Sequence, residues 1–114
     1  MHAHFGDPLI LEVEYFYKLG QNRVGTSIVE GYRIYDLDKE TEVYDINGKL
    51  LGRVQVISTT QTKISFLKER DIKASGYKSK EFLTRDLLFR YNKSRIDWIT
   101  IVKFFPKVKF VNRS

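Results

Sequence analysis

Cations near the C-terminus follow a spacing that suits a phosphate backbone. They occupy odd positions of the sequence: Lys103, Lys107, Lys109 and Arg113. Apolar residues occupy even positions between them: Phe104, Val108 and Phe110. Because alternate side chains of a strand point to opposite faces, one face would pack while the other binds nucleic-acid phosphates, together with Arg53 from an earlier strand. The alternative is an ordinary edge strand whose charges oppose aggregation, with the alternation broken at Pro106.

The charge of the chain is distributed unevenly. Residues 1–45 contain four Lys/Arg against nine Asp/Glu, a net −5, whereas residues 46–114 contain sixteen against five, a net +11. This asymmetry favours a polyanion, and nucleic acid in particular, as the partner of the second part. A solvated surface rich in Lys and Arg is the alternative.

The segment "RDIKASGYKSKEFL" indicates two helices interrupted at Ser75, Gly76 and Tyr77. A serine at such a junction either makes a local hydrogen bond within the turn or lines a binding site. We expect Tyr77 and Phe82 to pack in the core beneath the two helices, because aromatic residues at element junctions usually pack. A stacking platform for bases is the alternative.

The sequence indicates no metal or cofactor. His2 and His4 have the spacing of a metal pair on a strand, but no third ligand lies near them in sequence. The chain has no cysteine and carries neither a phosphate-binding loop nor a dinucleotide motif. Residues 1–7 are expected to be flexible.

The length of 114 residues suits one domain that spans the whole chain. No apolar run approaches the roughly 20 residues of a membrane span, and the first residues lack the basic and apolar regions of a signal peptide. We therefore expect a cytoplasmic protein without membrane contact. The content of Lys, Glu, Ile and Tyr also suggests growth at high temperature.

The first half predicts mostly strands. Short strands are expected at residues 9–12 and 23–29, and residues 13–19 either prolong the first strand or form a short helix. Residues 31–40 are expected to be loop with some strand. Asn47-Gly48 favours a hairpin with a type I′ turn, because both central residues of that turn need positive φ.

The second half predicts a long strand, two helices and a final strand. Val54, Val56, Ile64 and Phe66 share one face if the long strand is unbroken, and a bulge is expected near residues 59–60. Helices are expected at residues 67–74 and 80–91, the second capped by Ser79, before a final strand. This order predicts an α+β, mainly β fold: a small mixed β-barrel with two short helices covering one opening.

The second half also resembles a known family. It contains, in order, "GKLLGRVQVIS", "TKISFLKERDIKASGYKSKEFLTRDLLFRY" and "DWITIVKFF". This series is similar to the ASCH domain (activating signal cointegrator homology) of the PUA-like superfamily, in which a Gly-x-Ala-x-Ile strand precedes a short helix, a Glu-Gly-aromatic junction, a second helix and a Val-Thr-x-Ile-x-Phe strand. The match covers about residues 48–105, and it implies a PUA-like barrel.

The first half matches the family less well. Family members carry a Gly-x-Lys-x-x-Thr-x-Arg-like stretch, and the nearest equivalent here is "GQNRVGTSI". With one inserted residue, Arg23 takes the place of the lysine and Thr26 that of the threonine. Without the insertion, Asn22 and Gly25 take these places. We prefer the first alignment, because it keeps a cation and a hydroxyl three residues apart.

The resemblance implies two kinds of activity. Some relatives are amidohydrolases of acetylated cytidine that use a threonine nucleophile, a lysine and a glutamate, and others are reported to cleave RNA. Here Arg23 and Ser75 replace the lysine and the glutamate. Arginine does not release its proton and serine does not titrate near neutral pH, so neither supports that hydrolysis. A differently aligned lysine, such as Lys18, would restore it.

The sequence therefore predicts a module that binds RNA or a nucleotide without catalysis. Arg23, Thr26 and Ser75 are its expected ligand-binding residues. An ASCH-like hydrolase or ribonuclease that uses Thr26 is the first alternative. A protein-interaction domain, whose acidic first part meets a basic partner, is the second.

Overall fold

The computed structural model describes residues 4–5, 7–19 and 23–107. The strands are β1 (His4–Phe5), β2 (Leu9–Ile10), β3 (Gly25–Glu30), β4 (Arg33–Ile34), β5 (Glu40–Tyr44), β6 (Leu50–Lys63) and β7 (Trp98–Pro106). The helices are α1 (Val13–Leu19), α2 (Glu69–Ala74) and α3 (Lys80–Arg90), with a 3-10 turn, η1 (Ile64–Phe66), after β6. No helix in these ranges is long and apolar enough to cross a membrane.

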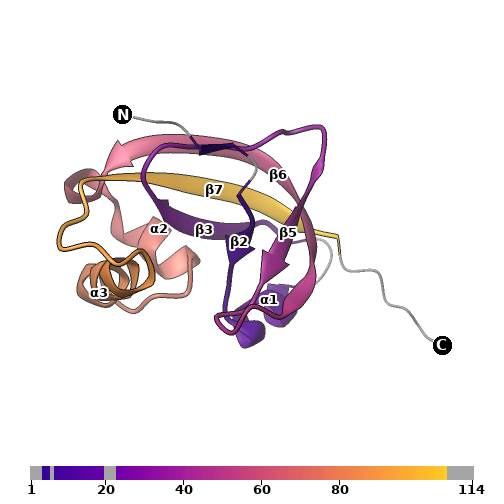
Figure 1. Cartoon of the computed structure of the whole chain (residues 1–114), viewed down its shortest axis with the longest axis horizontal. Coiled ribbons are helices and arrows are strands. Elements are labelled where there is room, and N and C mark those ends of the chain that lie inside the picture. The colour runs from indigo at the N-terminus through magenta and orange to yellow at the C-terminus, as the bar shows by residue number, and fades with distance from the viewer. Residues whose placement is uncertain (1–3, 6, 20–22, 108–114) are drawn as a thin grey trace.

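One curved sheet forms most of the molecule. Its strand order is β2-β5-β6-β7-β3, and a small second sheet pairs β1 with β4 in parallel. The long strands β6 and β7 run side by side across the structure, with α2 and α3 together at one end and α1 towards the other (Figure 1). The sheet is bent into a nearly closed mixed barrel whose two edge strands are β2 and β3.

Strand β6 is bent by an irregularity in its pairing with β7. The register shifts between Val56 and Ser58, which is the signature of a bulge. The sequence predicted this bulge two to three residues later. The strand ends at Lys63, so Ile64 and Phe66 belong to η1 and do not continue the buried face of Val54 and Val56, and Phe66 is exposed.

The hairpin between β5 and β6 is confirmed, but the predicted type I′ turn is wrong. The Gly48 amide donates to the Asp45 carbonyl and the Asp45 amide to the Lys49 carbonyl. Gly48 has a positive φ of 85°, whereas Asn47 does not. This is a longer loop with a left-handed glycine at its end, and the Asp45 carboxylate stabilises it by accepting from the Asn47 and Lys49 amides.

Residues 13–19 form a helix, which resolves the alternative that the sequence left open. The described residues therefore form three α-helices and not the expected two. The second and third begin and end close to the expected residues: Ser79 caps α3 by accepting from the Phe82 amide, and α2 begins at Glu69, two residues later than expected. The α+β architecture and the barrel-like sheet are confirmed, whereas the assignment to the PUA-like superfamily stays a prediction.

Two hydrophobic clusters hold the fold together, and β7 contributes to both. Even-numbered residues of β7, Val102 and Phe104, lie in a cluster inside the barrel, with Phe16 of α1. Odd-numbered residues, Ile99 and Ile101, lie in a second cluster beneath α2 and α3. Because alternate side chains point to opposite faces, β7 is the wall that separates the clusters. Helices α2 and α3 cover the face of β7 that carries Ile99 and Ile101.

The N-terminal segment contacts the body of the protein. His4 and Phe5 pair in register with Arg33 and Ile34 of β4. The Asp7 carboxylate forms an ion pair with Arg33. The expected flexibility of residues 1–7 stays a prediction, and residues 1–3 and 6 lie outside the described part of the chain.

Candidate functional site

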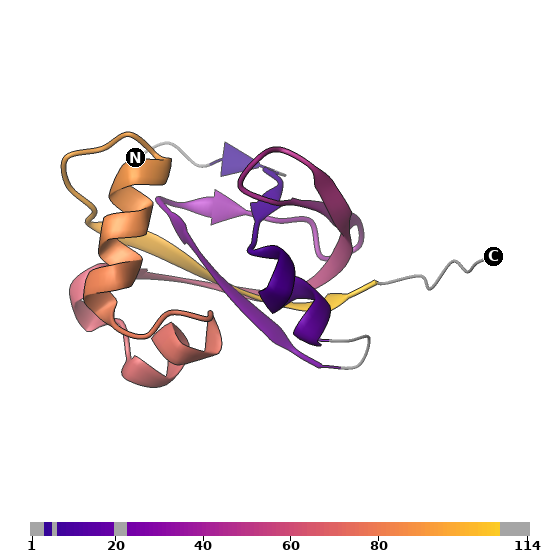
Figure 2. The ribbon, with the colours of Figure 1, turned by 90° about the horizontal axis from the view of Figure 1, so that it is seen from below.

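A cleft of about 250 Å³ lies at the gap in the barrel. Its walls come from the edge strands and the helices: Ile10, Leu11 and Glu12 after β2, Ser27 and Ile28 of β3, α1, and the junction between α2 and α3. Seen from below, β3 passes between α1 on one side and the α2–α3 pair on the other (Figure 2). The cleft therefore forms where the sheet does not close on itself.

The free edge of β3 is blocked at both ends by tyrosine hydroxyls. The Thr26 amide donates to the Tyr15 hydroxyl at 2.9 Å, and the Thr26 carbonyl lies 3.0 Å from the same oxygen. At the other end the Tyr91 hydroxyl lies beside the main chain of Glu30. Because Thr26 points its main-chain groups away from β7, Ile28, two residues further on, does the same.

Ile28 is thus the residue that presents a main-chain donor and acceptor at the free edge of β3. Gly31, which directly follows β3, donates to the Trp98 carbonyl of β7, so odd-numbered residues of this segment bond to β7 and even-numbered ones point outward. Ile28 lines the cleft, and no protein partner for its N–H or C=O occurs among the described residues. A buried main-chain group without a partner is costly, so a ligand or water must satisfy it.

The junction between α2 and α3 forms the opposite wall. The Ser75 hydroxyl donates to the Ile72 carbonyl at 2.7 Å, so the local hydrogen bond and the place beside a cleft, which the sequence offered as alternatives, both occur. Gly76 has a φ of +95°, and a Cβ there would lie 3.2 Å from the Tyr15 ring. A larger residue would be strained and would press on the tyrosine that blocks β3.

Tyr15 also connects the two walls of the cleft. Its hydroxyl donates to the Ala74 carbonyl at 2.7 Å, at the end of α2, while it accepts from the Thr26 amide. Burial raises the pKa of this hydroxyl above the ordinary value, so it keeps its proton for this bond. Tyr15 therefore fixes the distance between β3 and α2.

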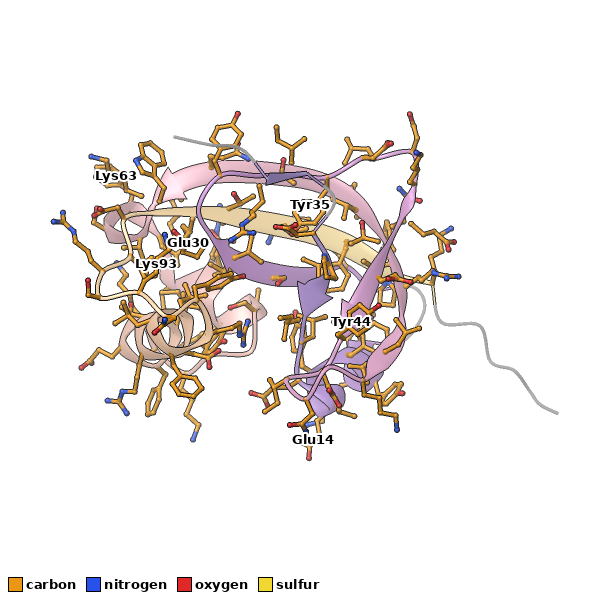
Figure 3. The ribbon with its side chains drawn as sticks, in the orientation of Figure 1. Glu14, Glu30, Tyr35, Tyr44, Lys63 and Lys93 are labelled. Carbon is orange, nitrogen blue, oxygen red and sulfur yellow. The ribbon has the colours of Figure 1, made fainter. Side chains whose placement is uncertain are left out.

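Charged side chains at the cleft are of both signs. Glu12, Glu14 and Lys18 come from the start and the end of α1, and Arg90 from the end of α3. Glu14 lies at the lower surface of the molecule in Figure 3. Arg90 donates to the Asp86 carboxylate at 2.6 Å. That carboxylate also accepts from Tyr77, and burial followed by this hydrogen bond raises the pKa of the Tyr77 hydroxyl.

Thr26 has a lysine and a carboxylate close to it, which corrects part of the sequence interpretation. The Lys103 ammonium donates to the Thr26 hydroxyl at 2.9 Å and lies 3.4 Å from the Asp71 carboxylate. The sequence predicts that Arg23 and Ser75 leave the site without a lysine and a carboxylate. This prediction is wrong, because strand β7 supplies Lys103 and helix α2 supplies Asp71.

This cluster is nevertheless poorly accessible. Thr26 is 2% exposed, and neither Thr26 nor Lys103 lines the cleft. A nucleophilic hydroxyl must reach the reacting carbon of the substrate, and here the hydroxyl is buried and accepts a hydrogen bond from Lys103. Lys103, expected to bind phosphate, is instead occupied by internal partners.

The other predicted ligand residues lie apart from the cleft. Arg23 is exposed just before β3, and it is not among the residues that line the cleft. Arg53 lies 3.7 Å from Glu42, and its carbonyl accepts from the amide of the exposed Lys107. Lys109 and Arg113 lie outside the described residues.

A second, more open cavity of about 600 Å³ borders the first one along α3. It includes Phe82 and Phe89, which are 52% and 88% exposed. The prediction that Phe82 packs in the core is wrong, because it occupies the outer face of α3. Tyr77 does pack against the cluster beneath the helices, as expected.

The structure brings together residues that sequence reasoning did not select. Tyr15, Ser27, Ile28 and Arg90 line the cleft, whereas Ser75 alone of the three expected ligand residues does so. No local motif marks these positions, because they are defined by the gap between β2 and β3. Among the described residues no group of three or more His, Asp or Glu side chains could hold a metal ion, and His2 lies outside them.

Comparisons with known proteins add no identification. No family model matches the chain, and neither does any curated protein or solved structure.

Proposed function

We propose that the chain is an ASCH-like, PUA-like module that binds RNA, or a nucleotide-sized part of it, in the cleft between β2 and β3. The single observation that carries this proposal is the outward-facing main chain of Ile28 at the wall of a small cleft. An N–H donor beside a C=O acceptor is the pair of groups that matches the hydrogen-bonding edge of an unstacked base.

The size of the free edge distinguishes a base from a peptide. A peptide that adds a strand pairs with several alternate residues of a sheet edge. Here the hydroxyls of Tyr15 and Tyr91 occupy the neighbouring positions at Thr26 and Glu30, so one residue remains. The cleft, at about 250 Å³, is also smaller than the roughly 300–1,000 Å³ of sites for drug-sized ligands. A single planar group fits these limits better than an extended chain.

The experiment measures binding of a ribonucleoside monophosphate series and of a short single-stranded RNA by titration at two salt concentrations. Affinity for the RNA should fall as salt rises, because binding releases counterions. Lys18→Glu, which places a negative charge beside the cleft, should weaken binding several-fold. Lys49→Glu, the same change at the exposed hairpin loop, is the matched control and should have little effect. Absence of binding, or equal effects of the two variants, would contradict the proposal.

A hydrolase is the second candidate, favoured by the contacts among Thr26, Lys103 and Asp71. Incubation with acetylated cytidine and with single-stranded RNA tests it, since a pure binder leaves both intact. Thr26→Val and Lys103→Met should abolish any turnover. The 2% exposure of Thr26 makes binding the better supported function.

A further inference from the structure

The second cavity continues the cleft along α3. The two share Glu12, Gly76 and Tyr77, so a ligand that extends beyond the cleft meets the outer face of α3 next. In Figure 2 this helix forms the end of the molecule beside β3. A strand longer than one nucleotide therefore has a direct route across this face.

Two aromatic rings lie on that face without packing partners in the core. Phe82 and Phe89 are seven residues apart, two turns of helix and about 10 Å, so both are on one side of α3. Phe89 is 88% exposed, an unusual position for a large apolar ring. Exposed aromatic rings on a groove are what single-stranded nucleic acids use for base stacking.

The charges around these rings favour a polyanion. The Arg85 guanidinium carbon lies 5.7 Å from the centre of the Phe82 ring, which holds this side chain over the face of the helix. Within the described part of the chain, neither Arg85 nor Lys78 has a carboxylate partner. Two carboxylates also line the cavity: Asp86, which forms an ion pair with Arg90, and Glu12, which lies where this cavity meets the first cleft.

We infer that α3 binds a stretch of single-stranded RNA that leaves the cleft, with a base stacked on Phe89 and a phosphate held by Arg85. This inference rests on the function proposed above. It adds a second subsite: the first base lies in the cleft, and the following nucleotides lie on α3.

The test compares one ribonucleoside monophosphate with a single-stranded RNA of about eight nucleotides. The RNA should bind at least about 10-fold more tightly than the monophosphate. Phe89→Ala should weaken RNA binding about 10-fold, which is the size typical of one lost stacked base, and leave the monophosphate unaffected. Phe66→Ala, at a ring that is 71% exposed on η1, is the control and should change neither.

Two further variants separate stacking from a simple apolar contact. Phe89→Tyr should retain RNA affinity, and Phe89→Leu should lose it as Phe89→Ala does. Arg85→Gln should lower the salt dependence by about one counterion. Full affinity in Phe89→Leu, or RNA that binds no better than the monophosphate, would overturn the inference while the proposed function stands. No binding of either ligand would overturn both.

Discussion

Two charged clusters at the ends of β3 differ in how completely they are enclosed. Beyond the C-terminal end of β3, Arg33 contacts Asp7 and Glu30, donates from Nε to the Glu30 carbonyl at 2.6 Å, and lies 5.1 Å from the centre of the Tyr91 ring. At the other end, Lys103 donates to the Thr26 hydroxyl and forms an ion pair with Asp71. The side chain of Arg33 is 10% exposed and that of Lys103 is 33% exposed.

The comparison teaches which charges support the fold and which remain adjustable. Glu30 has a second cation, Lys93, at 3.2 Å, and Figure 3 shows both beside the barrel. A buried charge with several partners is costly to disturb, because each partner loses its compensation. A half-exposed lysine can exchange one partner for another at low cost. The Arg33 cluster therefore supports the fold, whereas Lys103 can exchange its partners.

The largest expected effect comes from Arg33→Met. This change removes one of the two cations beside the Glu30 carboxylate together with the ion pair to Asp7, and we expect the free energy of unfolding to fall by about 3 kcal/mol. Urea denaturation followed by circular dichroism measures it. Arg95→Gln, at an exposed pair with Asp97, is the control and should change stability by less than about 0.5 kcal/mol. Similar losses in both variants would remove the distinction between the clusters.

The next expected effect is a loss of stability in alkali. Burial raises the pKa of Tyr35 and of Tyr91, both beside Arg33, above the value of 10.0. Above pH 10 these hydroxyls ionise in the unfolded chain first, so stability is full below pH 10 and falls as pH rises. One such tyrosine lowers the free energy of unfolding by up to about 1.4 kcal/mol per pH unit. Urea midpoints at pH 8, 10 and 11 measure this, and Tyr35→Phe should reduce the slope. A constant midpoint would contradict it.

A smaller effect is expected from Tyr15→Phe, at the cleft between the two clusters. The change removes the hydroxyl that joins Thr26 to Ala74, and we expect a loss of about 1–2 kcal/mol. Nucleotide affinity should also fall, because the walls of the cleft are no longer held at one distance. Thermal denaturation and titration measure the two effects. Tyr17→Phe, at an exposed ring on the same helix, should change neither.

The smallest effect is expected from Lys103→Met. The Lys103 side chain is 33% exposed to water, so we expect a loss of about 1 kcal/mol or less. Urea denaturation measures it beside Lys73→Met, which breaks an exposed pair with Glu69 and should be nearly neutral. A loss as large as that of Arg33→Met would show that Lys103 also supports the fold.

Local features of the fold were predictable because they depend on neighbouring residues. Ser79 caps α3 and Gly76 ends the preceding helix as the sequence indicated. The hairpin was predictable, but its turn type was not, because the Asp45 carboxylate stabilises a different loop. The outward position of Phe82 was missed, since spacing along a helix does not say how much of it is covered.

The sequence by itself determined the α+β class, the order of the hairpin, the two later helices and the final strand, and the uneven charge, because periodicity, capping and composition act over short distances. Only the tertiary structure decided what lies beside Thr26 and Ile28. Lys103 and Thr26 are 77 residues apart and meet because β3 and β7 pair in antiparallel register. The cleft exists because β2 and β3 do not meet, and a gap between two strand edges has no local sequence signal.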